Sequence, residues 1–293
     1  MGDRFRLVEM LTIRTQQTQP TQQTKESDSL NFLGIDIGSL SCDAVLINDR
    51  QGVLAAAVVP TGARNIAAVQ RARREVLHSA GCAEESIGGV VSTGYGRNRV
   101  ADRLAAVTEI TCHARGIHHL LPGIDVLIDI GGQDSKAMRL DRDGRVRDFA
   151  MNDKCAAGTG RFLEVMARAL ETDVDRLAAL DDGSDHLRLS STCTVFAESE
   201  VVSLIAEGAD TGSIVSALHR AVAARTLALV KRVCPHAGSF KVCMSGGVAH
   251  NRAVVKALGR LLACGIRVPP QPDTVGALGA ALIAREKYHA STR

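Results

Sequence analysis

The chain has few aromatic residues and lacks tryptophan. Two tyrosines and six phenylalanines make up 3% of its 293 residues. Proteins that bind single-stranded nucleic acid usually stack bases on aromatic side chains. The net charge of +3 is also too small to indicate a polyanion binder. The composition therefore argues against nucleic acid as a partner.

Long apolar runs and a secretion signal are also missing. No stretch approaches the roughly 20 apolar residues that span a bilayer, and the N-terminus lacks the apolar core of a signal peptide. Residues 1–30 include a stretch rich in Gln and Thr and are expected to form a disordered tail. We therefore expect a soluble, cytoplasmic protein that makes no contact with a membrane.

The eight cysteines are not expected to form disulfides, because the cytosol keeps thiols reduced. None belongs to a C-x-x-C pair, which disfavours thioredoxin-like chemistry and a zinc ribbon. Cys112 with His113, His118 and His119 could mimic a zinc set, but adjacent histidines diverge on a helix, so a structural role is favoured. P-loop and Rossmann glycine patterns are absent as well.

A duplicated pattern is present instead. "LGIDIGSLSCDAVLI" (33–47) and "LIDIGGQDSKAMRL" (127–140) share a strand, an acidic residue, a glycine turn and a returning strand. The two copies are about 93 residues apart, which indicates an internal repeat. Elsewhere strands alternate with helices, including a small-residue helix at 274–288, so the fold class is α/β.

Each copy places an aspartate, Asp36 or Asp129, at a strand end beside glycine. Glycine lets backbone N–H groups approach phosphate oxygens, and the carboxylate can organise hydrated Mg²⁺. A third glycine turn, "MSGGVAHN" (244–251), would leave room for a nucleoside. Each turn alone could be an ordinary β-turn; the three in this order favour a nucleotide site.

This set resembles the actin, Hsp70 and sugar-kinase superfamily. The resemblance implies a duplicated two-lobe actin-like (ribonuclease H-like) ATPase fold that binds ATP and Mg²⁺ between its lobes. Lobe I, with the first phosphate loop, would comprise 31–122 plus 275–290. Lobe II, with the second phosphate loop, the adenosine loop and the cysteines considered below, would comprise 123–274.

The resemblance also implies roles for individual residues. Asp36 and Asp129 would hold Mg²⁺, and Gln133 would position the attacking water, although a turn residue satisfying its own hairpin is an open alternative. Phosphate contacts are expected from Ser39, Leu40, Ser41, Cys42, Asp43, Gly131, Gly132 and Ala157, and adenosine contacts from Gly246, Gly247 and Asn251. The family commonly has lysine where this chain has Asp43, which puts the phosphate contacts of the first turn in question.

Two further motifs, "NDKCAAGTGRFLEVMA" (152–167) and "SSTCTVFAESEVVSLIAEG" (190–208), each place a cysteine before a helix. They resemble the ATP-dependent activators of 2-hydroxyacyl-CoA dehydratases and the ATPase subunits of benzoyl-CoA reductases. In that branch Cys155 and Cys193 would ligate a [4Fe-4S] cluster. Because such a cluster normally needs four thiolates, one cluster per dimer is expected, with a copy of this chain or a related subunit. Two buried free cysteines are the alternative.

The resemblance implies an ATP-driven electron donor. Ferredoxin or flavodoxin would supply the electron, and a catalytic reductase or dehydratase component would receive it. The N-terminal tail and Asp43 slightly favour the reductase-subunit version over the separable activator. A small-molecule kinase without a cluster and a regulatory ATP-binding module are the alternatives.

Overall fold

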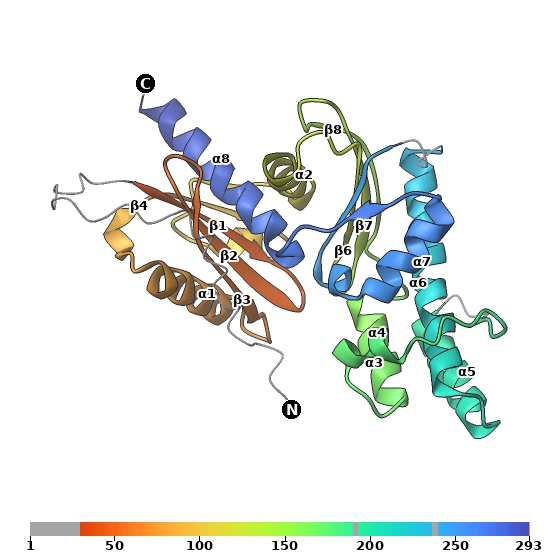
Figure 1. Ribbon diagram of the computed structural model, residues 1–293. Coiled ribbons are helices and arrows are strands. Elements are labelled where there is room, and N and C mark those ends of the chain that lie inside the picture. The colour runs from red at the N-terminus through yellow and green to blue at the C-terminus, as the bar shows by residue number, and fades with distance from the viewer. Residues whose placement is uncertain (1–29, 190–192, 236–239, 293) are drawn as a thin grey trace, which may run out of the picture.

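The computed structural model describes residues 30–189, 193–235 and 240–292. They form two lobes, each built on a five-stranded mixed sheet (Figure 1). All but the last residue of the predicted disordered tail, 1–30, lies outside the described residues.

The two sheets have the same topology. The first has the order β3-β2-β1-β4-β5 and the second the order β8-β7-β6-β9-β10. In both, the first three strands form an antiparallel meander, and the fourth and fifth join in parallel. The strands of the first sheet are β1 (Asn31–Ile37), β2 (Ser41–Asn48), β3 (Val53–Pro60), β4 (Ile87–Thr93) and β5 (Ala105–Ala106). Those of the second are β6 (Val126–Ile130), β7 (Ser135–Leu140), β8 (Val146–Asn152), β9 (Val242–Ser245) and β10 (Ile266–Arg267).

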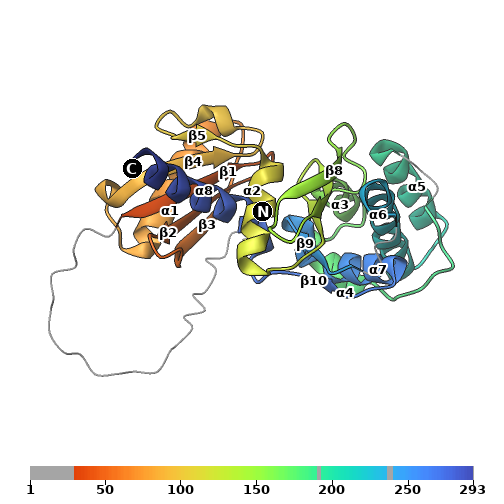
Figure 2. The same ribbon diagram turned by 90° about the horizontal axis from the view of Figure 1, so that it is seen from above.

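Helices cover both faces of each sheet. They are α1 (Asn65–Ala80), α2 (Glu109–Leu120), α3 (Gly160–Ala169), α4 (Leu177–Leu180), α5 (Thr194–Ala206), α6 (Thr211–Val233), α7 (Arg252–Leu262) and α8 (Val275–Ser291). The apolar residues of α1 pack on one face of the first sheet and those of α8 on the other. In the second lobe α3, α6 and α7 share a core on one face, and α2 packs on the other. Seen from above, α2 lies between the two lobes (Figure 2).

The α2–α8 contact requires two glycines. A Cβ on Gly279 would lie 1.8 Å from the Cys112 carbonyl oxygen, and one on Gly116 would lie 2.1 Å from that of Val275. Since real Cβ atoms do not approach backbone oxygens this closely, any larger residue would separate the helices. The small residues of α8 thus allow it to pack closely against α2.

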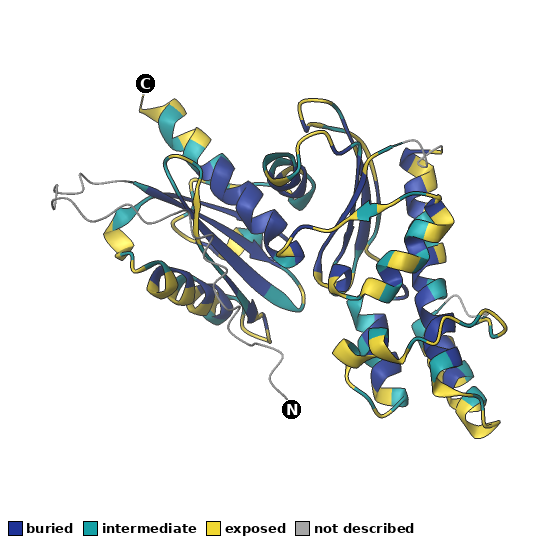
Figure 3. Cartoon of the chain, viewed as in Figure 1, coloured by how far each residue is buried: buried dark blue, intermediate teal, exposed yellow. Residues whose placement is uncertain are grey.

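The small-residue helix expected at 274–288 is present as α8, with its C-terminal end a few residues later, whereas β8 was not predicted. Three of its seven residues are exposed and only Ala150 is buried, so it lacks an apolar strand pattern. By length and composition α6 could cross a membrane. However, two thirds of its most apolar window is buried inside the second lobe, as in the core helix of a soluble protein (Figure 3).

Candidate functional site

The two duplicated aspartates meet at one histidine. Asp36 lies near the end of β1 and Asp129 near the end of β6, and both are more than 90% buried. On α2, His113 places Nε2 3.5 Å from Asp36 Oδ2 and Nδ1 3.3 Å from Asp129 Oδ1. The structure therefore brings the predicted Mg²⁺ ligands, one from each sheet, to a common point.

Neighbouring groups shift the pKa values of His113 and Asp129. Burial disfavours the imidazolium, but Asp129 and Asp36 outweigh it and raise the pKa of His113 above its ordinary value. Burial alone would raise the pKa of Asp129, but His113, Lys136 and Ser245 lower it to about 2. Asp129 is therefore an ionised carboxylate, as a ligand of hydrated Mg²⁺ must be.

A buried lysine completes the charge balance on the second lobe. Lys136 on β7 is 2% exposed. Its Nζ lies 2.9 Å from Asp134, 3.1 Å from Asp129 and 3.5 Å from Glu109. Burial opposes the charge, but these three carboxylates raise the pKa of Lys136 above its ordinary value.

Asp43 occupies the equivalent position on the first lobe. It faces Asp36 across the β1–β2 ladder as Lys136 faces Asp129 across the β6–β7 ladder. Its Oδ2 accepts a hydrogen bond from Ser41, while the buried Oδ1 has no partner among the described residues. Burial, together with Asp36 and Asp273, raises the pKa of Asp43 well above its ordinary value.

The two glycine turns touch each other. A Cβ on Gly132 would lie 2.4 Å from Leu40 Cγ, so the β6–β7 turn abuts the β1–β2 turn. Ser41, Cys42 and Asp43 belong to β2, which pairs with β1 and β3. The Cys42 side chain is fully buried in the core of the first lobe. The predicted phosphate contacts of these residues, and of the exposed Ser39, stay predictions.

The loop after Cys155 is bonded to the second turn. Thr159 Oγ1 donates to the Gly132 carbonyl at 3.1 Å, and the N–H of Arg161 donates to the same oxygen at 2.8 Å. The N–H of Gly160 donates to Gly131 at 3.0 Å. Ala157 is buried within this loop. Gln133, at the tip of the turn, is exposed, and its role in orienting water remains a prediction.

The third glycine turn adjoins the same acids. Ser245 Oγ donates to Asp129 Oδ1 at 2.9 Å, and a Cβ on Gly246 would lie 2.9 Å from that oxygen. Gly247 lies against Asp273. Asn251 instead caps α7 and lies 3.0 Å from His219 Nε2. The turn thus lies at the site, and the predicted adenosine contacts of Gly246, Gly247 and Asn251 stay predictions.

Cys155 and Cys193 both precede helices that pack together. Both side chains are partly exposed. Cys193 is the N-cap of α5, Cys155 lies five residues before the start of α3, and α3 contacts α5. Helix N-termini favour thiolates and anionic groups, which applies directly to Cys193, and the role of both cysteines as cluster ligands stays a prediction.

Four of the six remaining cysteines are buried, whereas Cys82 and Cys264 are partly exposed. Cys42, Cys112, Cys234 and Cys243 are buried, and burial raises the pKa of Cys112 and Cys243 to about 12. His113 points to the two acids, whereas His118 packs against Gly144. This divergence agrees with the structural interpretation of the Cys112 and histidine set.

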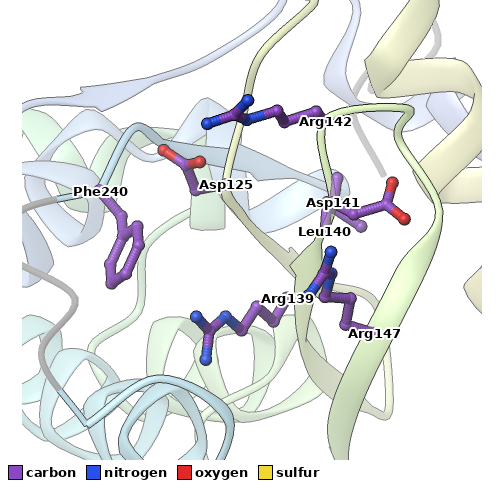
Figure 4. Close-up of a pocket in the computed structure, with 7 residues that line it drawn as sticks. All are labelled: Asp125, Arg139, Leu140, Asp141, Arg142, Arg147 and Phe240. Atoms are coloured by element: carbon purple, nitrogen blue, oxygen red, sulfur yellow. The ribbon is translucent and has the colours of Figure 1, made fainter.

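A separate surface groove lies at the opposite end of β7. Its volume is about 310 Å³, and Figure 4 shows its lining: Asp125, Arg139, Leu140, Asp141, Arg142, Arg147 and Phe240. The Phe240 ring lies under the Arg139 guanidinium. The groove takes no part in the arrangement around Asp36 and Asp129.

Sequence reasoning missed the contacts of His113 and Lys136. The repeat could have predicted the position of Lys136 opposite Asp129. Lys136 follows Asp43 by 93 positions, the same spacing that separates Asp129 from Asp36. No sequence signal places His113 between the acids, because its contacts come from four separate elements.

Comparison with known proteins agrees with this geometry. The sequence model of the BadF/BadG/BcrA/BcrD ATPase family matches residues 33–284. The chain belongs to this family. Its fold is the duplicated, two-lobed actin-like ATPase fold that the sequence predicted.

Several family members have named roles. The activator of lactoyl-CoA dehydratase from Anaerotignum propionicum is 48% identical over 87% of this chain and 97% of that protein. One of the subunits of benzoyl-CoA reductase from Thauera aromatica is 31% identical over 73% of this chain and 77% of that protein. The activator of 2-hydroxyisocaproyl-CoA dehydratase from Clostridium difficile, solved with bound ADPNP, is 41% identical. Its TM-score is 0.83, and the match covers 90% of this chain and 97% of that one.

Proposed function

We propose that this chain is an ATP-dependent activator that delivers a low-potential electron to a 2-hydroxyacyl-CoA dehydratase component. Mg²⁺ and ATP would occupy the region between the lobes, with Asp36 and Asp129 as ligands of the hydrated cation. The ADPNP-bound relative supports a nucleotide there. The chain's higher identity to dehydratase activators than to the reductase relative supports the activator version.

Cys155 and Cys193 would hold half of a [4Fe-4S] cluster, and a second subunit would supply the other two thiolates. When bound, the cluster would carry one electron, received from ferredoxin or flavodoxin. Exposed apolar side chains follow Cys193 along α5: Val195 and Phe196 are 65% and 69% exposed, and Val202 54%. Apolar side chains exposed this close to Cys193 suit an interface with a second copy of the chain.

Hydrogen bonds between the second glycine turn and the loop after Cys155 are the main support for the proposal. The Gly132 carbonyl binds Thr159 and Arg161, and Thr159 lies four residues beyond Cys155. A movement of the second glycine turn on nucleotide binding or hydrolysis would therefore displace the backbone that holds Cys155. Changes in the surroundings of a cluster alter its potential.

Anaerobic purification tests the cluster. We expect about four irons and four sulfides per dimer. Cys155→Ala should remove the iron, whereas Cys264→Ala, which changes another partly exposed cysteine outside the motifs, should retain it.

Iron-free wild-type protein after anaerobic reconstitution would overturn the electron-donor role. If that protein were a monomer that phosphorylated a small-molecule hydroxyl, the kinase alternative would replace it. Capture of the native complex would identify the catalytic component and show whether the partner subunit is a copy.

A further inference from the structure

His113 is a buried polar residue to which the proposed chemistry gives no role. It is 5% exposed and belongs to α2, which lies between the two lobes. Its ring contacts Asp36 of β1, Asp129 of β6 and Ser245 of β9. It thus joins the two acids, which come from different sheets.

The ring is held on every side. Ser245 Oγ lies 3.4 Å from Nδ1, and a Cβ on Gly276 of α8 would lie 2.7 Å from Nε2. Gly276 also abuts Asp36, whose Oδ2 such a Cβ would approach to 2.0 Å. Packing therefore fixes the imidazole, and the imidazole fixes the carboxylates.

Without a group between them, the two carboxylates would repel each other. Like charges at short range in a buried site push side chains apart or force one to take up a proton. Lys136 and Ser245 anchor Asp129 from the second lobe. For Asp36, His113 is the ion-pair partner found among the described residues. The separation of the acids thus depends on His113.

We infer that His113 is a positioning residue that sets the separation of Asp36 and Asp129, and so prepares both carboxylates for one hydrated divalent cation. The inference rests on the proposed function, because it takes these acids as the Mg²⁺ ligands. A merely structural His113 would stabilise the fold without distinguishing metal-bound from metal-free nucleotide. The two roles therefore differ in a binding measurement.

The test compares His113→Ala and His113→Gln with His119→Ala, a control six residues along the same helix. ADP binding is measured by calorimetry on the full chain, once with Mg²⁺ and once with EDTA. Residues that orient metal ligands typically contribute 10- to 100-fold in metal affinity. We therefore expect His113→Ala to weaken ADP binding about tenfold or more with Mg²⁺, and by less than about twofold in EDTA.

His113→Gln should recover part of the loss, because its amide has one donor nitrogen where the imidazole contacts the two acids through two separate ring nitrogens. His119→Ala should bind as wild type does. Equal losses with and without Mg²⁺, or no loss, would overturn the positioning role. If His113→Ala does not fold by circular dichroism, His113→Gln decides by the same criterion. Wild-type protein that binds no ADP in either buffer would overturn the proposed function itself.

Discussion

The two lobes repeat the same backbone but carry opposite charges at equivalent positions. In both, an aspartate near the end of the first strand pairs in register with a hydroxyl residue of the parallel strand, Thr93 or Ser245. A glycine with positive φ follows each hydroxyl residue: Gly94 beside Asp36 and Gly246 beside Asp129. On the returning strand, however, the first lobe has Asp43 and the second has Lys136.

This difference shows which features of the repeat the site uses. The aspartate near the end of the first strand and the positive-φ glycine after the parallel strand are present in both lobes. The charge opposite the acid is not kept: Lys136 is surrounded by three carboxylates, while Asp43 has an oxygen without a partner among the described residues. The second lobe thus pairs its acid with a cation on the returning strand, whereas the first lobe places a second acid there.

Lys136→Ala should have the largest effect on stability. It leaves Asp129, Asp134 and Glu109 without their common cation, and removing one partner of a buried ion pair costs about 3–5 kcal/mol. The free energy of unfolding, measured by urea titration, should fall by that amount. Lys241→Ala, at an exposed lysine, should change it little. A loss as small as that of the control would contradict the role given to Lys136.

Asp43→Asn should raise the free energy of unfolding, whereas Lys136→Ala should lower it. It removes a buried ionisable group with one oxygen that lacks a partner among the described residues, worth about 1–3 kcal/mol at neutral pH. Because folding raises the pKa of Asp43 above 3.8, ionising it costs stability as pH rises above that value. The advantage of the variant should therefore grow with pH and vanish below 3.8.

The exposed change Asp148→Asn is the control for the Asp43 experiment and should show no such pH dependence. An Asp43→Asn variant that is less stable than wild type at neutral pH would mean that the Asp43 carboxylate has a stabilising partner.

Asp134→Asn should have the smallest effect. Its side chain is 27% exposed, so solvent screens its interaction with Lys136, and Asp129 and Glu109 remain in place. A loss of about 0.5–1 kcal/mol is expected, measured by urea titration at low and high salt. A loss as large as that of Lys136→Ala would show that Asp134, rather than Asp129, is the main partner.

Much of the fold followed from the sequence, because the repeat and the apolar strands are local patterns. Asp36 and Asp129 could be named as a pair since each stands at a strand end beside glycine. His113 could not, because its role arises only when α2 crosses between the sheets. The Asn251 side chain caps α7, which the motif did not predict, and its expected adenosine contact stays a prediction.

We expect nucleotide bound between the lobes to alter the [4Fe-4S] cluster proposed at Cys155 and Cys193, and electron paramagnetic resonance can detect this change. The spectrum of the anaerobically purified, reduced dimer would be recorded without nucleotide and with MgATP. A changed spectrum in wild type and an unchanged one in Asp129→Asn are predicted. A wild-type spectrum that stays the same although MgATP is bound would contradict the proposed effect of nucleotide on the cluster.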